Sequence, residues 1–332
     1  MKLTFVWQNH TTWERTWIEK IFAPIAGEQV IDGEHRVVLD NCLMIDSYLH
    51  SQPREYYAQF RGKNAWLLHL SDETYEGGYD CYDNFRGVFR NYWAGIFNPR
   101  RVIHFPLGYT TGFTASANTL EASQRPYLWS FLGQANKSSR PEMIQALLPL
   151  QPHFAHITDQ GDTQPIGKQQ YQRIQCDSIF VPCSMGNVNM ESFRVFESLE
   201  NGCIPILEKR PTLDYFAHLL GPHPLPIFSS WKSAAQFIAA NRDDSAALNK
   251  LQAECVAWWS NHKSAISQRI QDFLATAPGS EAGPYLSWRY RLPGWQPVEL
   301  MRHGTVRSLA RRVNLQIQRL VKQGKLRETK GA

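Results

Sequence analysis

Apolar and polar positions follow two spacings along the chain. Short apolar runs bounded by turn residues predict buried strands at Lys2–Trp7, Arg36–Leu39, Ala65–Leu70 and Val102–Phe105. Apolar positions at helical spacing lie between these runs, as at Trp13–Phe22. Strands that alternate with helices indicate an α/β domain built on a parallel sheet.

A second series of strand and helix patterns follows a polar stretch. Residues 110–123 are rich in Thr, Ser, Ala and Gly and have no apolar periodicity, which is typical of a linker. The second series predicts strands at Tyr127–Leu132, Ser178–Val181 and Cys203–Leu207, and helices at Pro141–Leu148, Ala234–Asn241 and Ala246–Leu274. We therefore expect an N-terminal α/β domain at 1–122, a second α/β domain at 123–275, and a connecting segment with a tail at 276–332.

The segment Phe180–Leu207 combines a strand, a polar loop, an amphipathic helix and another strand. Arg194 and Glu197 lie on one face of the predicted helix, and Gly202 ends it. A helix N-terminus offers N–H groups to a diphosphate, an arginine adds a forked cation, and a carboxylate can accept two ribose hydroxyls. The alternative is an ordinary strand–helix–strand unit in which Arg194 and Glu197 form a surface ion pair.

A family resemblance rests on this segment and on four shorter ones. The run S-F-R-x-x-E-x-x-x-x-G-C-I-P-I at 192–206 resembles the nucleotide-sugar segment of exostosin-like glycosyltransferases, the family that includes the ribitol xylosyltransferases. RPYLWSFLGQANKSSR, HLSDE, FRNYW and FPLGY are similar to further family segments and occur in the family's order, at 125–140, 69–73, 89–93 and 105–109. The family usually carries a leading membrane anchor, whereas this chain begins with a predicted strand.

The resemblance implies the GT-B fold, in which two doubly wound Rossmann-like domains face each other across a cleft. It also implies an inverting transfer of a sugar from a nucleotide diphosphate, with UDP expected, to a glycan or lipid-linked acceptor. Backbone N–H groups of the 184–187 loop would bind phosphate, together with two arginines. The residues expected to bind the nucleotide sugar are Arg140, Ser184, Gly186, Asn187, Ser192, Arg194 and Glu197.

The catalytic base is expected at the carboxyl end of the strand Ala65–Leu70, because the cleft of this fold lies there. Inverting transfer needs a group that takes the proton of the acceptor hydroxyl. Asp72 is the first candidate, Glu73 the second and His69 the third. The alternative is that Ser71 or Asp72 caps a following helix.

Arg86, Arg90 and Trp93 are the candidates for binding the acceptor. Guanidinium groups bind anions, and aromatic faces stack on the C–H surfaces of sugars. For Trp93, packing in the core is the alternative.

Charge is concentrated at the end of the chain. Of 332 residues with a net charge of +5, residues 302–332 hold nine Arg or Lys and one acid, a local charge of 9 − 1 = +8, which leaves 26 − 29 = −3 for the rest. We therefore expect no nucleic-acid partner. Apolar positions within 303–332 have helical spacing and predict a basic amphipathic helix, which would bind an anionic membrane surface or pack on the protein.

The remaining composition narrows the function further. There is no D-x-D motif in the sequence, so we expect no metal and no cofactor beyond the nucleotide-sugar donor. No apolar run has the length of a membrane span, so we expect a cytoplasmic protein with possible contact to the inner face of the membrane only through its tail. Two other functions stay open. One is a GDP-fucose-type transferase, although Glu197 is followed by Ser198 and not by that family's usual lysine. The other is a non-catalytic module that binds a glycan or nucleotide.

Overall fold

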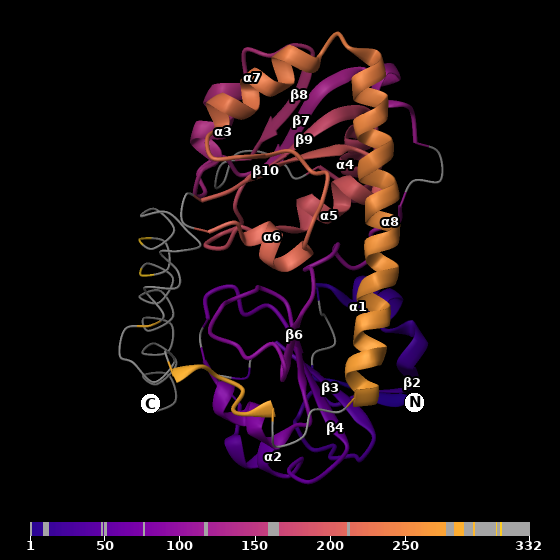
Figure 1. Ribbon diagram of the computed structural model, residues 1–332, viewed down its shortest axis with the longest axis vertical. Coiled ribbons are helices and arrows are strands. Elements are labelled where there is room, and N and C mark those ends of the chain that lie inside the picture. Colours follow the sequence, from indigo (N-terminus) through magenta and orange to yellow (C-terminus); the bar gives the residue numbers. More distant parts are fainter. Residues whose placement is uncertain are drawn as a thin grey trace, which may run out of the picture.

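The computed structural model describes most of the chain, in two α/β units that follow one another along the long axis of the molecule (Figure 1). The described residues are 2–8, 13–47, 49, 52–75, 77–115, 119–158, 166–210, 213–276, 282–288, 295, 310 and 313.

The first unit contains a six-stranded parallel sheet in the order β2-β1-β3-β4-β5-β6. Its strands are β1 (Leu3–Trp7), β2 (Ala26–Ile31), β3 (Cys42–Asp46), β4 (Ala65–His69), β5 (Val88–Arg90) and β6 (Val102–His104). Its helices are α1 (Arg15–Ile21) and α2 (Arg54–Ala58), with 3₁₀ turns at Ala23–Ile25 and Tyr79–Asn84. A parallel sheet with helices is the architecture that the sequence predicts for this part of the chain.

The strand predicted at Arg36–Leu39 is wrong. The carboxylate of Asp32 accepts the backbone N–H groups of Arg36 and Val37 at 2.8–3.0 Å, so these donors are satisfied by a side chain and not by a sheet neighbour. The strand beside β1 is instead Cys42–Asp46, whose five residues are all buried.

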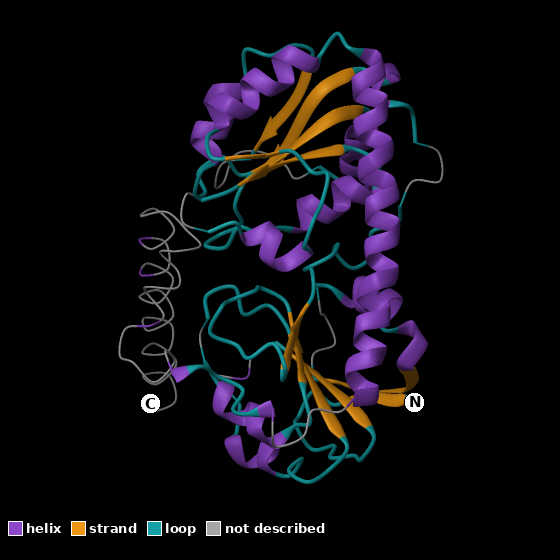
Figure 2. Ribbon diagram, viewed as in Figure 1, coloured by secondary structure: helices purple, strands orange, loops and turns teal. Residues whose placement is uncertain are grey.

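The second unit contains a five-stranded parallel sheet in the order β11-β10-β9-β7-β8. Its strands are β7 (Tyr127–Gly133), β8 (His153–Ile157), β9 (Ser178–Cys183), β10 (Ile204–Glu208) and β11 (Ile227–Phe228). Its helices are α3 (Arg140–Leu147), α4 (Lys168–Cys176), α5 (Phe193–Glu200), α6 (Tyr215–Leu220) and α7 (Trp231–Asn241), after a 3₁₀ turn at Ala122–Gln124. Helices cover both faces of the sheet (Figure 2).

The strand order of the second sheet reverses at β7, because the chain proceeds from β7 outward to β8 and then returns to β9 on the other side of β7. Ligands of doubly wound folds bind outside the carboxyl ends of the strands at such a reversal. The turn after β7 and the loop after β9 both emerge there. This topology places two of the family-like segments at one end of the sheet.

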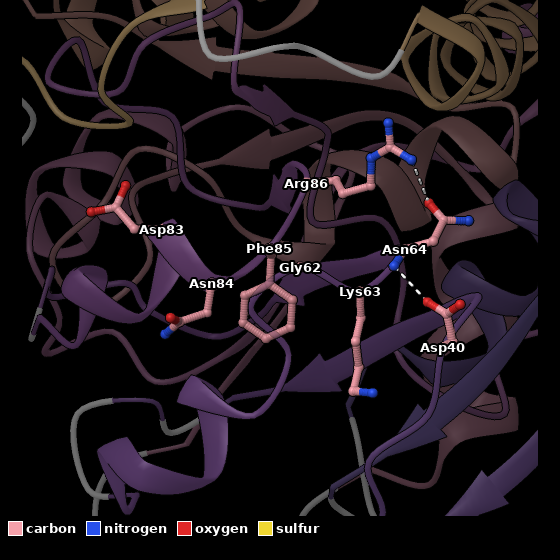
Figure 3. Close-up of a pocket in the computed structure, with 8 residues that line it drawn as sticks. All are labelled: Asp40, Gly62, Lys63, Asn64, Asp83, Asn84, Phe85 and Arg86. Atoms are coloured by element: carbon pink, nitrogen blue, oxygen red, sulfur yellow. Dashed lines mark hydrogen bonds between the residues drawn. The ribbon is translucent and has the colours of Figure 1, made fainter.

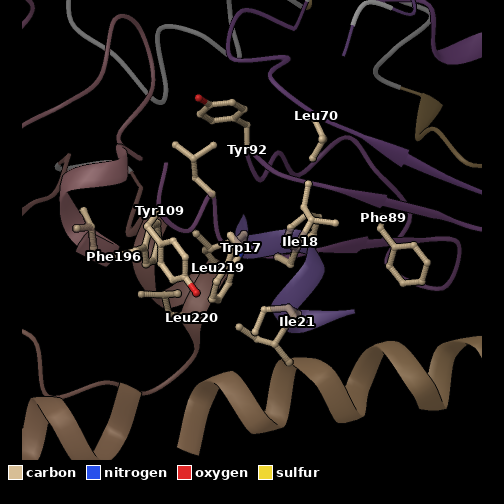
Figure 4. Close-up of a cluster of buried hydrophobic side chains, with 14 of the residues drawn as sticks. Trp17, Ile18, Ile21, Leu70, Phe89, Tyr92, Tyr109, Phe196, Leu219 and Leu220 are labelled. Carbon is tan, nitrogen blue, oxygen red and sulfur yellow. The ribbon is translucent and has the colours of Figure 1, made fainter. Parts of the chain in front are cut away.

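The long helix α8 (Ser245–Thr276) runs along both units (Figure 1). The indole of Trp259 stacks between Trp17 of α1 and Phe196 of α5, with ring centroids 5.6 and 5.5 Å away. Figure 4 shows the buried cluster around Trp17 and Phe196, which joins side chains of the two units. One apolar core is therefore continuous across the boundary between them.

The last turns of α8 pack on the first sheet, where Phe273 lies against Trp66 and Phe89 at ring-centroid distances of 5.5 and 5.4 Å. The predicted boundary at residue 275 thus assigns the whole helix to the second domain, whereas its packing is shared by both.

No helix among the described residues is both long enough and apolar enough to cross a membrane. The predicted basic helix at 303–332 lies outside the described residues except at positions 310 and 313.

Candidate active site

The predicted nucleotide-sugar segment folds as β9, a loop, α5 and β10. Ser192 precedes α5 in an extended conformation, with φ −146°, and its hydroxyl has no hydrogen-bond partner among the described residues. Gly202 ends the helix with φ +65°, a backbone conformation that other residues adopt only with strain. The arrangement matches the strand, loop, helix and strand predicted from the sequence.

Two arginines meet on one aromatic ring at the carboxyl end of β7. The guanidinium carbon of Arg194 lies 4.4 Å from the centroid of Phe131, and that of Arg140 lies 5.9 Å from it. Arg194 donates to the carbonyl of Leu132 at 2.7 Å, and Arg140 to that of Gln134 at 3.0 Å. The structure therefore brings together the two cations that the sequence assigned to one diphosphate.

Glu197 lies one turn after Arg194 but does not pair with it, so the alternative of an exposed Arg194–Glu197 ion pair is wrong. One carboxylate oxygen accepts the hydroxyl of Thr110 and the other that of Tyr171, both at 3.0 Å. Burial, followed by the charge of Glu197, raises the pKa of the Tyr171 hydroxyl far above its usual range. Glu197 also lines a cavity of about 390 Å³ between α4 and residues 110–114. A buried carboxylate held by two hydroxyls, next to a cavity, suits recognition of a vicinal diol.

The loop between β9 and α5 is held from the other unit. Glu73 Oε1 accepts the backbone N–H groups of Val188 at 2.8 Å and Asn189 at 3.2 Å, and Oε2 accepts the amide of Asn187 at 3.0 Å. Glycine at 186 leaves room for this packing, because a Cβ there would lie 2.9 Å from the backbone carbonyl oxygen of Glu191 and 2.8 Å from Glu73 Oε1. The fully buried hydroxyl of Ser184 has no hydrogen-bond partner among the described residues.

Asp72 is occupied by a buried ion pair with Arg90. The carboxylate lies 3.2 Å from the Arg90 guanidinium, which has no exposed surface, and also accepts the hydroxyl of Tyr79. His69 Nδ1 lies 2.7 Å from the hydroxyl of Tyr82, to which Arg90 also donates. No helix begins within residues 71–75, where only 73 and 74 form a turn, so the helix-capping alternative is wrong.

Arg90 keeps its charge in this site. Burial by itself would lower the pKa of its guanidinium, but Tyr82, Tyr79 and Asp72 outweigh that effect and raise the pKa. The ring of Phe97 adds a cation–π contact at 4.1 Å. Arg90 is therefore a fully buried cation that organises the end of β4, and an acceptor has no access to it in this conformation.

The structure separates the three predicted acceptor residues. Trp93 is half-buried and stacks on His218 of α6 at 4.4 Å, which places it at the contact between the units. Arg86 precedes β5 and donates to Asn64 at 3.1 Å, at the amino ends of the strands. Figure 3 shows Arg86 lining a cavity of about 590 Å³ there. The grouping of Arg86 with Arg90 is therefore wrong, because Arg86 lies just before the amino end of β5 and Arg90 is the last residue of that strand.

The sequence analysis did not identify two buried carboxyls at the contact between the units, those of Glu14 and Glu191. Glu14 accepts from Ser71 Oγ at 3.1 Å and from Asn91 Nδ2 at 3.3 Å, while its other oxygen has no hydrogen-bond partner among the described residues. Glu191 accepts the backbone N–H of Leu107 and the hydroxyl of Tyr215.

Burial raises the pKa of both carboxyls to about 7, and the charge of Glu14 contributes to the shift of Glu191. Glu191 directly precedes the S-F-R motif, which is a signal that could have drawn attention to it. Glu14 follows no comparable motif, and only the fold brings it to the carboxyl ends of β4 and β5.

Comparison with known proteins identifies the family. The model of the RXYLT1 C-terminal domain matches residues 110–277, about half of the chain and most of the second unit. The chain belongs to this family of exostosin-like glycosyltransferases. Its match to ribitol-5-phosphate xylosyltransferase 1 of Mus musculus is 23% identical and covers 64% of this chain and 54% of the mouse protein. The match to the Danio rerio protein of the same name is 28% identical and covers 36% and 29%. The chain thus spans about half the length of the mouse relative and less than a third of the Danio rerio relative.

Solved structures confirm the predicted GT-B fold of this family member. An alpha1,3-fucosyltransferase superposes with a TM-score of 0.53 at 13% identity, covering 82% of this chain and 90% of the other. A DNA-modifying beta-glucosyltransferase superposes with a TM-score of 0.50 at 9% identity, covering 82% and 99%. At these identities the likeness shows the fold alone.

Proposed function

We propose that this family member is an inverting glycosyltransferase that takes a sugar from a nucleotide diphosphate donor. The observation that carries the proposal is the convergence of Arg140 and Arg194 on Phe131, one helical turn from the Glu197 carboxylate and its cavity. In the proposed site, the two arginines would bind the diphosphate and the Glu197 carboxylate would accept hydrogen bonds from the ribose hydroxyls. This placement agrees with the rule that ligands of doubly wound folds bind where the strand order reverses. The family membership of residues 110–277 supports the same reaction class.

Each of these residues has a separate task in the proposed reaction. The N-terminus of α5, Arg140 and Arg194 stabilise the negative charge that grows on the leaving nucleotide diphosphate. The carboxylate of Glu197 would accept the ribose hydroxyls in place of Thr110 and Tyr171. Ser184 and Ser192 have unused hydroxyls on the same loop, which supports their assignment to the donor.

The base acts from the first unit on the acceptor hydroxyl. Of the three candidates, Asp72 is committed to Arg90 and His69 is buried against Tyr82, whereas Glu73 is half-buried and lies next to the donor loop. The order of the candidates therefore becomes Glu73, then Asp72 and His69. Trp93, which packs on His218 at the contact between the units, remains the candidate for binding the acceptor.

The curated relatives suggest the first substrates to test. Their name describes transfer of xylose to ribitol 5-phosphate, so UDP-xylose and ribitol 5-phosphate form the first donor and acceptor pair. GDP and GDP-fucose are the comparison, since they test a fucosyltransferase-type donor. We further propose that the reaction needs no metal, because the two arginines and the α5 dipole supply positive charge at the diphosphate.

The decisive experiment measures UDP and GDP binding by calorimetry in the wild type and in Arg194→Ala. Loss of a charge-assisted phosphate contact of about 1.5–3 kcal/mol lowers affinity about tenfold to hundredfold. Arg173→Ala is the matched control, because that arginine is on α4 with 84% of its side chain exposed. Unchanged affinity in a folded Arg194→Ala protein would refute the assignment. Nucleotide release from UDP-xylose separates a transferase from a non-catalytic binding module.

A further inference from the structure

The Glu73 contact joins the first unit to the phosphate-side loop of the second. One carboxylate receives three N–H donors, two from the backbone at 2.8 and 3.2 Å and one from the Asn187 amide at 3.0 Å. Converging N–H groups form an anion site, and they can donate to the oxygen of a carboxylate or of a phosphate. In this structure the protein's own side chain is the anion that fills the site.

Two further hydrogen bonds hold this loop, and neither involves Glu73. The Ser138 hydroxyl donates to the carbonyl of Asn187 at 3.0 Å, and the N–H of Gly186 donates to the carbonyl of Asn189 at 2.8 Å. Neither bond involves the first unit. We therefore expect the N–H groups of Val188 and Asn189 to keep their direction when the carboxylate leaves.

The position of this site matches the donor and not the acceptor. Residues 187–189 lie between β9 and α5, in the loop that leads to Ser192 and to the first turn of α5 with Arg194. A nucleotide diphosphate bound at that N-terminus would bring its own phosphate oxygens to the same N–H groups. Two anions cannot share them, since like charges at hydrogen-bond distance repel strongly.

We propose that Glu73 occupies a phosphate subsite formed by Asn187, Val188 and Asn189, and that the donor diphosphate displaces it. This inference rests on the proposed function. Displacement frees both oxygens of Glu73, which then serve the acceptor hydroxyl as the base. The base thus becomes available only after the donor has bound, so an acceptor that arrives first meets an occupied carboxylate.

The test is equilibrium binding of sodium pyrophosphate, UDP and GDP to the wild type, Glu73→Ala and Glu73→Gln at constant ionic strength. While Glu73 occupies the subsite in most molecules, the apparent affinity for phosphate is reduced to the fraction of molecules in which the subsite is free. Removing Glu73 therefore increases the apparent affinity by the inverse of that fraction. Glu73→Ala is expected to bind pyrophosphate and UDP about threefold to thirtyfold more tightly than the wild type. Glu28→Ala, at an exposed carboxylate of β2, is the matched control and should match the wild type.

Glu73→Gln separates occupation of the site from simple charge repulsion. The glutamine loses the charge but keeps an oxygen for the N–H groups of Val188 and Asn189, so its gain should be smaller than that of Glu73→Ala. Amide hydrogen exchange at Val188 and Asn189 gives a second readout. It should accelerate in unliganded Glu73→Ala and slow again with pyrophosphate. Equal gains in both variants without faster exchange would mean repulsion at a distance and overturn the inference.

The outcomes distinguish this inference from the proposed function. If the wild type binds UDP or GDP but folded Glu73→Ala binds them no more tightly, only the displacement is wrong. If neither protein binds pyrophosphate, UDP or GDP, the donor site itself is wrong and the proposed function fails with it. Thermal unfolding checks each variant. If Glu73→Ala does not fold, Glu73→Gln decides, and unchanged affinity there overturns the inference.

Discussion

The buried pair of Asp72 and Arg90 makes a quantitative prediction about Asp72→Asn. The Arg90 side chain has no exposed surface and that of Asp72 has 4%, with 3.2 Å between the charged groups. Removing one charge of a buried pair costs about 3–5 kcal/mol, because the other charge remains uncompensated. Asparagine retains an oxygen for Arg90, and the ring of Phe97 still faces the cation at 4.1 Å. The expected loss of unfolding free energy is therefore about 3 kcal/mol, at the low end of that range.

Urea unfolding followed by tryptophan fluorescence measures this loss. Asp80→Asn is the control, since Asp80 pairs with Arg54 on the surface, where their side chains are 48% and 82% exposed. An exposed pair contributes at most about 1 kcal/mol. The double variant Asp72→Asn with Arg90→Met should recover part of the loss, because no buried charge remains. If Asp72→Asn is as stable as Asp80→Asn but transfers no sugar, the pair does not have the structural role described here and Asp72 returns as the first candidate for the base.

Three further predictions concern pH, metals and the tail. Glu14 has a pKa of about 7 in the folded protein against 4.5 for an ordinary glutamate, so ionisation costs stability as pH rises from about 4.5 to 7, on the order of 3 kcal/mol. Urea unfolding at pH 5 and pH 8 should show a smaller decrease in Glu14→Gln than in the wild type, and equal decreases would contradict the burial argument. EDTA should leave most nucleotide release from UDP-xylose intact, whereas complete loss restored by manganese would show a metal requirement. Deleting residues 303–332 should reduce binding to anionic vesicles, most strongly at low salt, and a wild type that ignores such vesicles would exclude the membrane contact.

The sequence predicts the nucleotide-sugar segment well because its signals are local. Apolar runs mark β9 and β10, helical spacing marks α5, and Gly202 marks the end of the helix. Local sequence patterns could not predict that Arg140 and Arg194 lie together, because 194 − 140 = 54 positions separate them. Only the family resemblance predicted it. No sequence motif marks Phe131 as the residue whose ring both arginines contact.

Contacts between distant segments account for what the sequence could not predict. The sequence pattern of an aspartate after a strand does not distinguish a catalytic base from the partner of a buried arginine. The pairing of strands in the sheet brings Arg90, at the end of β5, to Asp72. Glu14 acquires its raised pKa from burial that the packing of the two units creates. The strand predicted at Arg36–Leu39 failed for a related reason, because Asp32 supplied the hydrogen bonds that a sheet neighbour would have given.

Helix α8 has a consequence for how the protein is made. Its last residues, including Phe273, cover Trp66 and Phe89 of the first sheet, although the chain reaches Phe273 only after the whole second sheet. During synthesis this apolar face of the first sheet therefore stays uncovered until the segment around Phe273 has left the ribosome. A fragment that ends before residue 266 would carry that face into solution and should aggregate, so the two units are expected to be obtained folded only as one chain.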